Sequence, residues 1–311
     1  MQIPVKRIDS SRCVACHYTV SRRKAFTLIE VLVVVAIIAL LISILLPSLR
    51  RTRSQARAAI CLANLHRIGH ASVFYTNQYG AFPPVRLTKM YDPAAGTWEK
   101  FYLKIRHSEF RRATPRWGWF FDYGVGPVIQ PGKYATEADF NAALEMDNNY
   151  FFCPSLTGEH ERDIRNGAYG YNWQYLGNSL ITVGDRYARW PVKVSYVKAP
   201  ARTVLMADSR GGGIPHGLHS YTLDPPRLAE EFDATRFGPS RLDVPDQLRH
   251  SPVEMRHNGR GNVAFVDGHA EAMLLRQLGY ALDENGVTIG NGSGAVNTLW
   301  NGYGRDSLPS P

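Results

Sequence analysis

A single carboxylate, Glu30, lies inside a highly apolar run of the sequence. Residues 26–46 are interrupted by polar side chains at only three positions, Thr27, Glu30 and Ser43. An acid at the centre of a membrane helix costs about 3 kcal/mol on insertion scales, and acids in such helices usually have a function. The sequence therefore raises the question of which cation pairs with this carboxylate.

A proteolytic cut between Ala25 and Phe26 would supply that cation. Glu30 would become the fifth residue of the shortened chain, about 6 Å along the helix from the new α-amine. Within one helix that amine points away from the side chain, so the better geometry pairs the carboxylate with the amine of a neighbouring, axially shifted copy. Two unit charges at about 4 Å attract by about 4 kcal/mol before desolvation is subtracted. Glu30 could in this way set the register between subunits.

The apolar run is long enough to cross a membrane, because its helix would span about 30 Å. It is longer than the core of a cleavable secretory signal, and no A-x-A site follows it. Basic residues flank both ends, so charge alone leaves the orientation open. The sequence after Pro47 continues as a helix, and we expect one helix over residues 26–79 with a kink point at the proline.

The second part of this helix carries an apolar stripe at spacings of three and four residues. The stripe predicts the face on which a globular head packs. We expect Asn64 and Ala71, with Arg57 and Arg67, largely on the other side. The stripe consists of Ala58, Cys61, Leu62, Leu65, Ile68, Ser72 and Val73.

The N-terminal residues resemble a known signal. "RRKAFTLIEVLVVVAIIALLISILLP" is similar to the class III signal of type IV prepilins and type II secretion pseudopilins. The resemblance implies that residues 1–25 are a cytoplasmic leader, which a prepilin peptidase removes after Ala25. It also implies that Phe26 is N-methylated, that residues 26–47 cross the inner membrane and that Glu30 is the assembly residue. Ala25 stands where the family nearly always has Gly.

Several later blocks resemble a large bacterial family of prepilin-like proteins. That family is named for a C-terminal His, nine intervening residues and Asp-Gly, which in this chain are His257, Asp267 and Gly268, the motif of residues 257–268. The matching blocks occur in the same order up to about residue 275. They are "ICLANLHRIGHASVFYTNQYGAFPP", "YFFCPS", "AYGYNWQYLG", "PARTVLMADS" and "RHNGRGNVAFVDGHAEA".

The residues around the Asp-Gly pair predict a β-hairpin. Asp267 and Gly268 would form a two-residue turn, because both tolerate positive φ. His257 would hydrogen-bond and hold the preceding loop. The alternative is a calcium site such as some major pseudopilins use, built from Asp267 with Asp208 or a carbonyl. Calcium needs six to eight oxygens and the local carboxylates are too few, so we expect no cofactor and keep calcium as the alternative.

The remaining cysteines and histidines give weaker signals. On the pilin topology Cys61 and Cys153 both face the oxidising side, so a disulfide can form from the long helix to the "FFCPS" segment, which we expect as a strand. The alternative is that the two cysteines are buried free thiols. The later histidines lack the tight helical spacing of a metal signature, so we expect scattered residues rather than a transition-metal centre. They are His216, His219, His250, His257 and His269.

Two patterns in the leader are typical of other classes of protein. Cys13, Cys16 and His17 fit the C-x-x-C-H pattern of haem attachment. If residues 1–25 are a leader, however, these three residues stay in the cytoplasm on a peptide that is discarded. The same three residues lack a fourth ligand for zinc. "SRRKAF" resembles a twin-arginine export signal, a minor alternative because the apolar run is longer than that pathway usually uses.

The charge distribution and the lack of catalytic motifs argue against nucleic-acid binding and against enzymatic activity. The net charge is +9, but the first 25 residues carry six basic side chains against Asp9 and so account for +5. Little basic excess remains elsewhere, so we expect no nucleic-acid partner. The sequence has no metalloprotease, serine-hydrolase or P-loop motif, so we expect no enzyme.

The sequence therefore predicts an α+β, pilin-like protein anchored once in the inner membrane. A long N-terminal transmembrane helix would pack on the antiparallel β-sheet of a periplasmic head, residues 80–311. Its partners would be prepilin peptidase and other pilin or pseudopilin subunits. The alternative is a membrane-anchored protein that binds a carbohydrate or another surface ligand and uses the signal only for processing and anchoring.

Overall fold

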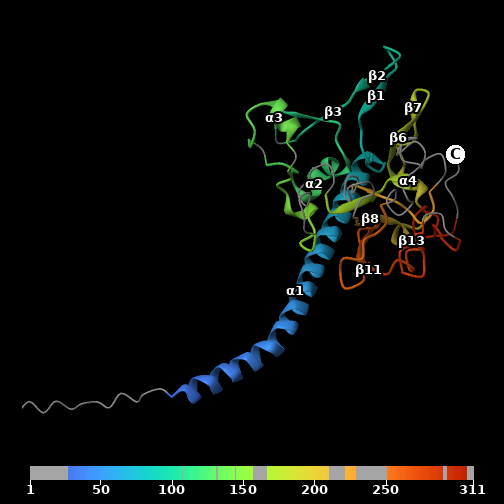
Figure 1. The fold of residues 1–311 in the computed structure, drawn as a ribbon. Helices are drawn as coiled ribbons and strands as arrows, with labels where there is room; N and C mark the ends of the chain where they lie inside the picture. The colour runs from blue at the N-terminus through green and yellow to red at the C-terminus, as the bar shows by residue number, and fades with distance from the viewer. Residues whose placement is uncertain are drawn as a thin grey trace, which may run out of the picture. The chain divides into compact units, whose positions relative to one another are not determined.

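The computed structural model (Figure 1) describes residues 27–106, 108–130, 132–143, 145–156, 167–209, 221–228, 251–289 and 293–306. The expected leader, the cleavage position at Ala25 and Phe26 and the leader's cysteines lie outside the described residues. The same is true of His216, His219 and His250. The chain divides into two compact units, residues 1–50 and residues 51–311.

One long helix, α1 (Leu28–Tyr79), contributes to both units and continues through Pro47. It ends where Gly80 adopts a φ of +69° and donates its N–H to the carbonyl of Thr76 at 2.8 Å. Glycine adopts this left-handed cap without strain. We call residues 28–50 the apolar half of α1 and residues 51–79 the head-bound half.

The head-bound half buries one face within the second unit. Cys61, Leu65, Ile68 and Ser72 of the predicted stripe are buried. The rest of the stripe lies at its half-buried edges, at Ala58, Leu62 and Val73. The prediction that this face receives the head is therefore confirmed.

The prediction was wrong for Asn64 and Ala71, which are buried on the same face. The Asn64 amide donates to the carbonyl of Phe152 at 2.8 Å, and this hydrogen bond offsets the cost of burying a polar group. Ala71 packs against Gly124 of α2 (Asp122–Val125), where an added Cβ would lie 2.2 Å from the Cβ of Ala71. Each residue is buried by a partner distant in the sequence.

A five-stranded sheet lies at the centre of the second unit, in the order β11-β10-β8-β5-β9. The prediction of an antiparallel sheet was incomplete, because β5 and β9 pair in parallel while the other neighbours are antiparallel. The strands are β5 (Tyr169–Asn172), β8 (Val204–Asp208), β9 (Thr222–Leu223), β10 (Gly261–Phe265) and β11 (Ala270–Met273). A long apolar helix followed by antiparallel and mixed sheets confirms the α+β class, and the arrangement is consistent with a pilin-like fold.

Short elements surround this sheet. The described residues form four two-stranded sheets: β1 (Lys89–Asp92) with β2 (Thr97–Lys100), β3 (Tyr102–Lys104) with β4 (Arg111–Ala113), β6 (Asn178–Val183) with β7 (Arg186–Arg189), and β12 (Ala281–Leu282) with β13 (Thr288–Ile289). The other helices are α3 (Glu137–Ala142), α4 (Trp173–Leu176), η1 (Trp117–Phe121), η2 (Asn149–Phe151), η3 (Val194–Tyr196) and η4 (Pro200–Arg202). Trp117 and Trp119 of η1 are buried and belong to the aromatic core.

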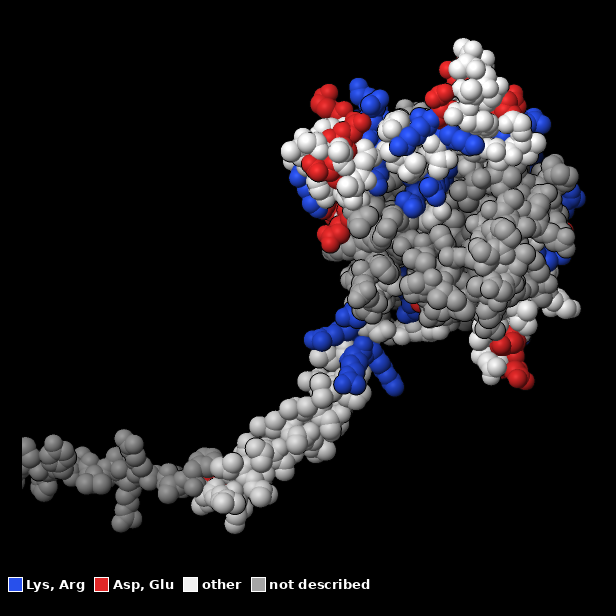
Figure 2. Space-filling model, turned by 45° about the horizontal axis from the view of Figure 1, so that its top comes forward, with Lys and Arg blue, Asp and Glu red and all other residues white. Residues whose placement is uncertain are grey.

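Charged side chains are distributed unequally over the described surface. On the face shown in Figure 2, basic and acidic side chains of the second unit are interspersed. Glu30 is the only acidic or basic residue among residues 28–49. The apolar half of α1 therefore has a surface unlike that of the second unit.

Candidate functional site

Thr27 and Glu30 cap the N-terminus of α1. Glu30 Oε2 accepts a hydrogen bond from the N–H of Thr27 at 2.8 Å, and Thr27 Oγ1 accepts one from the N–H of Glu30 at 3.3 Å. This reciprocal arrangement is a capping box, which satisfies backbone donors that the helix leaves unpaired. Glu30 thus has partners in its own chain. These partners were not predicted, although Thr-x-x-Glu before an apolar run is the sequence signature of a capping box.

The apolar half of α1 is exposed on all sides. Its Leu, Ile and Val side chains are 39–80% exposed. The Ser43 hydroxyl donates to the carbonyl of Leu40 at 2.7 Å, so this polar group is satisfied within the helix. Among the described residues, α1 is the one helix that is long and apolar enough to cross a membrane by length and composition. A helix that is apolar all round is typical of a membrane span.

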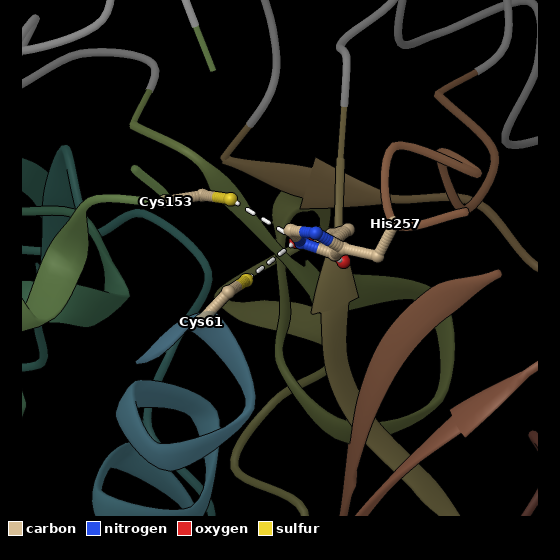
Figure 3. A group of neighbouring side chains, drawn as sticks. Cys61, Cys153 and His257 are labelled. Atoms are coloured by element: carbon tan, nitrogen blue, oxygen red, sulfur yellow. Dashed lines mark hydrogen bonds and ion pairs between the residues drawn. The ribbon is translucent and has the colours of Figure 1, made fainter. Parts of the chain in front are cut away.

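Four side chains from distant parts of the second unit meet in its core. Cys61 lies on α1, Cys153 follows η2 and His257 precedes β10 (Figure 3). The fourth residue, Asp208, ends β8. All four are buried, with at most 4% of their surface exposed. We call them the Cys–His–Asp cluster.

The polar atoms of this cluster converge on one small volume. The Cys61 thiol lies 3.1 Å from Asp208 Oδ1, and Cys153 Sγ lies 3.3 Å from His257 Nε2. The same Nε2 is 3.3 Å from Asp208 Oδ2. One sulfur, nitrogen or oxygen atom from each of the four residues lies within 4.8 Å of the others. Cys, His and Asp are the ligands that proteins use to hold zinc.

The geometry differs from that of a catalytic triad. In a triad the acid holds one ring nitrogen of the histidine while the other nitrogen faces the nucleophile. Here Asp208 and Cys153 face the same atom, His257 Nε2. The other ring nitrogen has no hydrogen-bond partner among the described residues. The arrangement therefore resembles a ligand shell rather than a proton relay.

Burial and hydrogen bonding shift the pKa values of the cluster. Hydrogen bonds from Cys61 and His257 lower the pKa of the Cys153 thiol to about 5, against the opposing effect of burial. Burial raises the pKa of Cys61 far above its ordinary value. Burial also lowers the pKa of His257, but hydrogen bonds to Asp208 and Cys153 outweigh it and raise the pKa to about 9. At neutral pH this favours a Cys153 thiolate beside a His257 imidazolium.

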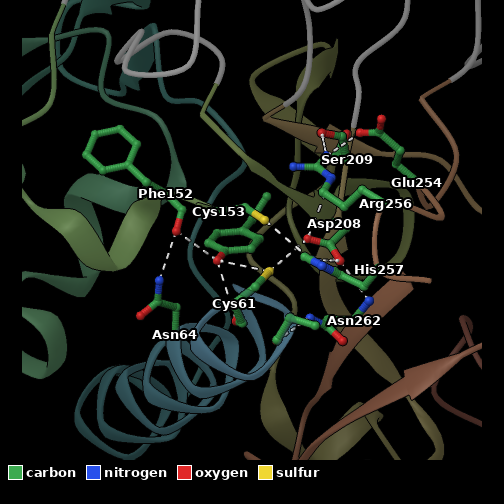
Figure 4. Close-up of polar contacts among 12 residues, drawn as sticks. Cys61, Asn64, Phe152, Cys153, Asp208, Ser209, Glu254, Arg256, His257 and Asn262 are labelled. Carbon is green, nitrogen blue, oxygen red and sulfur yellow. Dashed lines mark hydrogen bonds and ion pairs between the residues drawn. The ribbon is translucent and has the colours of Figure 1, made fainter. Parts of the chain in front are cut away.

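Neighbouring groups hold the cluster in place (Figure 4). The N–H of Asn262 donates to Asp208 Oδ2 at 2.7 Å, and Arg256 Nε lies 3.9 Å from Oδ1 of the same carboxylate. The Arg256 side chain is only 5% exposed and donates to the carbonyl of Ser209 and to the partly exposed carboxylate of Glu254. The Tyr169 hydroxyl lies 3.3 Å from Cys61 Sγ.

The expected disulfide is not formed. Cys61 and Cys153 are both buried free thiols, which is the alternative that the sequence left open. The prediction that the long helix and the "FFCPS" segment meet at these two residues is confirmed. Cys153 lies in a loop after η2 rather than in the expected strand. Asp208 and His257 were not predicted as partners of the thiols.

The predicted hairpin at Asp267 and Gly268 forms, but its turn is longer than expected. Phe265 N–H donates to the carbonyl of His269 at 2.9 Å, and Gly268 N–H donates to that of Phe265 at 3.0 Å. These bonds enclose a three-residue loop, and only Gly268, with a φ of +96°, has positive φ. The loop is the three-residue hairpin connection that ends in a left-handed glycine.

The two ends of the His-x9-Asp-Gly motif lie at opposite ends of β10. Near its start, His257 joins the Cys–His–Asp cluster, and the Asn262 amide donates to the carbonyl of Ala58 on α1 at 3.1 Å. Beyond its end, a Cβ added at Gly69 of α1 would lie 3.0 Å from the Gly268 carbonyl oxygen. The nine-residue spacing therefore lets one strand contact the head-bound half at two points.

The structure does not bring together the two acids considered for calcium. Asp267 lies in the turn after β10 and pairs with the ring of His269 at 2.5 Å. Asp208 lies beside the start of β10, where it accepts from Asn262. We expected His257 only to hold the preceding loop. In the structure its ring also contacts Asp208 and Cys153.

The comparisons with known proteins concern the N-terminal segment. Residues 20–46 match the family model described as the Prokaryotic N-terminal methylation motif. No curated protein and no solved structure matches the chain. The chain thus carries a prepilin-type methylation motif on a long apolar helix. This combination supports a processed, pilin-like subunit with a single-pass membrane anchor.

Proposed function

We propose that the chain is a structural subunit of the pilin or pseudopilin type. A prepilin peptidase cleaves it after Ala25, and the mature chain assembles into, or primes, a type IV pilus or a type II secretion pseudopilus. The match of residues 20–46 to the methylation motif carries this proposal. The role is structural rather than catalytic.

The proposed topology follows from the processing step. The resemblance to prepilins implies a peptidase that acts on the cytoplasmic side, so residues 1–25 remain in the cytoplasm. The apolar half of α1 then crosses the inner membrane, and the head lies in the periplasm. An exposed apolar surface of this kind supports such an anchor, because it needs lipid or other apolar helices around it.

Glu30 has two successive roles in this proposal. In the single chain it closes the capping box with Thr27. In the assembly its carboxylate pairs with the Phe26 α-amine of a neighbouring copy. At about 4 Å in a partly desolvated setting, the two charges attract by about 4 kcal/mol before the cost of removing water from them is subtracted. The pairing would set the axial step between subunits.

We further propose that the head belongs with the prepilin-like proteins named for the His-x9-Asp-Gly motif. The placement of His257 near Cys61 of α1, and of Gly268 near Gly69 of α1, at the two ends of β10 supports a structural reason for the motif. The motif would fix one strand along the helix and leave ligand recognition to other parts of the head.

Two substitutions at Glu30 separate its roles. Glu30→Gln keeps an acceptor for the Thr27 N–H but removes the charge, whereas Glu30→Ala removes both. We expect both variants to be processed and to insert, and both to lose at least about tenfold in cross-linked or sheared assemblies, the equivalent of 1.4 kcal/mol. Ser43→Ala, in the same half of the helix, should assemble like the wild type. Normal assembly of Glu30→Gln would rule out the charge pairing.

A further inference from the structure

We propose that the Cys–His–Asp cluster is a structural zinc site that joins α1 to the head. The inference does not depend on the proposed function, because it rests only on the geometry and chemistry of four buried side chains. The site would take its ligands from the helix, the loop after η2, the end of β8 and the loop before β10.

The distances fit a tetrahedral ion. With zinc–sulfur bonds of about 2.3 Å and zinc–nitrogen or zinc–oxygen bonds of about 2.1 Å, a tetrahedron separates sulfur from nitrogen by about 3.6 Å and nitrogen from oxygen by about 3.4 Å. The corresponding separations here are 3.3 Å for Cys153 Sγ to His257 Nε2, 3.3 Å for Nε2 to Asp208 Oδ2 and 3.1 Å for Cys61 Sγ to Asp208 Oδ1. Outward shifts of up to about 0.5 Å would therefore admit the ion.

Without a metal ion, one hydrogen on His257 Nε2 must serve two acceptors. His257 Nε2 carries at most one hydrogen, yet it faces both a sulfur and a carboxylate oxygen at 3.3 Å. A cation at the centre would bind both, together with the Cys61 sulfur. Such convergence of ligand atoms on one point is the expected geometry of a metal site.

The charges also fit a divalent ion. Two thiolates, one carboxylate and Zn²⁺ sum to a single negative charge, and the Arg256 guanidinium beside Asp208 supplies one positive charge. Glu254, the other carboxylate on Arg256, is partly exposed and can be solvated. A buried site needs this neutrality, because isolated charges are costly to bury.

The ligand set selects zinc over calcium or magnesium. Thiolate and imidazole ligands favour zinc, whereas calcium and magnesium prefer several oxygens. Four protein ligands fill a tetrahedral shell and leave no position for substrate, which is typical of structural zinc. The Asn262 N–H and Arg256 would orient the Asp208 carboxylate, as neighbouring groups do around most metal ligands.

Elemental analysis of the full chain tests the site. We would use a Cys13→Ser/Cys16→Ser background, so that Cys61 and Cys153 are the only thiols, with a tag that lacks histidine and purification in detergent without chelator. We expect about one zinc ion per chain, and at least about tenfold less in Cys61→Ser/Cys153→Ser. The control is His66→Ala/His70→Ala, which removes an exposed histidine pair 3.3 Å apart on α1 and should keep the zinc.

Thiol protection provides a second readout that needs no ligand variant. In the chain with all four ligands intact, Cys61 and Cys153 should both resist a thiol reagent until a strong chelator removes the metal, and both should then react. Replacement of zinc by Co²⁺ should give the visible absorption of tetrahedral cobalt with thiolate ligands.

Three results would overturn the inference. The first is less than about one tenth of a zinc ion per wild-type chain after zinc-supplemented growth. The second is a Cys61–Cys153 disulfide in the intact mass of the unreduced protein. The third is full zinc retention in the cysteine double variant. If that variant does not fold, thiol protection in the wild type decides, because two thiols that react equally with and without chelator also contradict the site.

Discussion

The two halves of α1 share one helix but have different surroundings. In the apolar half, the side chains of Leu28, Val35 and Ile44 are 80%, 53% and 68% exposed. In the head-bound half, Cys61, Leu65 and Ile68 are fully buried. Helical structure is the same in both, so the difference lies in what covers the apolar surface.

This contrast shows where each half obtains its stability. The head-bound half is covered by its own chain, through the Cys–His–Asp cluster and the close contacts at Gly69 and Gly124. Among the described residues, the apolar half obtains from the chain its capping box, its backbone hydrogen bonds and the local hydrogen bonds of Ser43 and Ser48. Its apolar surface needs partners outside the chain, which the proposed function supplies as lipid and neighbouring subunits.

The largest effect is expected when the buried acid of the cluster is removed. Asp208→Ala leaves Arg256 and His257 without their shared carboxylate, and should lower the free energy of unfolding by about 3–5 kcal/mol. The matched control is Asp267→Ala, which removes a partly exposed pair with His269 and should cost at most about 1 kcal/mol. Urea denaturation followed by tryptophan fluorescence measures both, since all six tryptophans lie beyond residue 79. Equal losses would contradict the cluster's role.

Isoleucine truncations compare the helix surfaces directly. Ile68→Ala removes fully buried methyl groups and should destabilise the head by about 2–5 kcal/mol. Ile60→Ala, on the same half but 52% exposed, and Ile38→Ala, in the apolar half, should each change the denaturation midpoint little. A large loss for Ile38→Ala would show that the apolar half also packs on its own head.

Close packing around the head-bound half is tested by adding one methyl group. At Gly124 a Cβ would lie 2.2 Å from the Cβ of Ala71, so Gly124→Ala should cost about 1–3 kcal/mol through overpacking. Gly118→Ala adds the same group 3.4 Å from the Phe151 ring, an ordinary contact, and should cost less. Thermal unfolding of both variants measures the difference, and equal melting temperatures would contradict the close contact.

The smallest effect concerns the cap of the apolar half. Thr27→Ala removes the side-chain acceptor for the Glu30 N–H and should cost about 1 kcal/mol of helix stability at that end. Faster hydrogen exchange of the first-turn amides, with an unchanged denaturation midpoint of the head, is the expected result. Unchanged exchange in those amides would argue against the capping box.

The sequence predicted the features that depend on local pattern. Apolar composition and three- and four-residue spacing predicted α1 and the burial of Leu65 and Ile68. The Thr-x-x-Glu pattern was equally local, but Glu30 was interpreted only as a charge for a neighbouring subunit. Asn64 was placed on the wrong face, because its partner, the Phe152 carbonyl, is distant in the sequence.

The Cys–His–Asp cluster could not be predicted in full, because its members are also distant from one another in the sequence. Asp208 is 147 residues from Cys61, and His257 is 104 residues from Cys153, so no short motif contains the set. The order of strands in the central sheet brings them together. The sequence did indicate that Cys61 and Cys153 meet, because each lies on an element expected to pack against the other.

The most direct test of the proposed function is the mass of the mature N-terminal peptide from native membranes. We expect a chain that begins with N-methylated Phe26, and retention of the leader when Ala25 is replaced by Leu. A wild-type chain that keeps residues 1–25, or that begins at any other residue, would contradict the proposed processing.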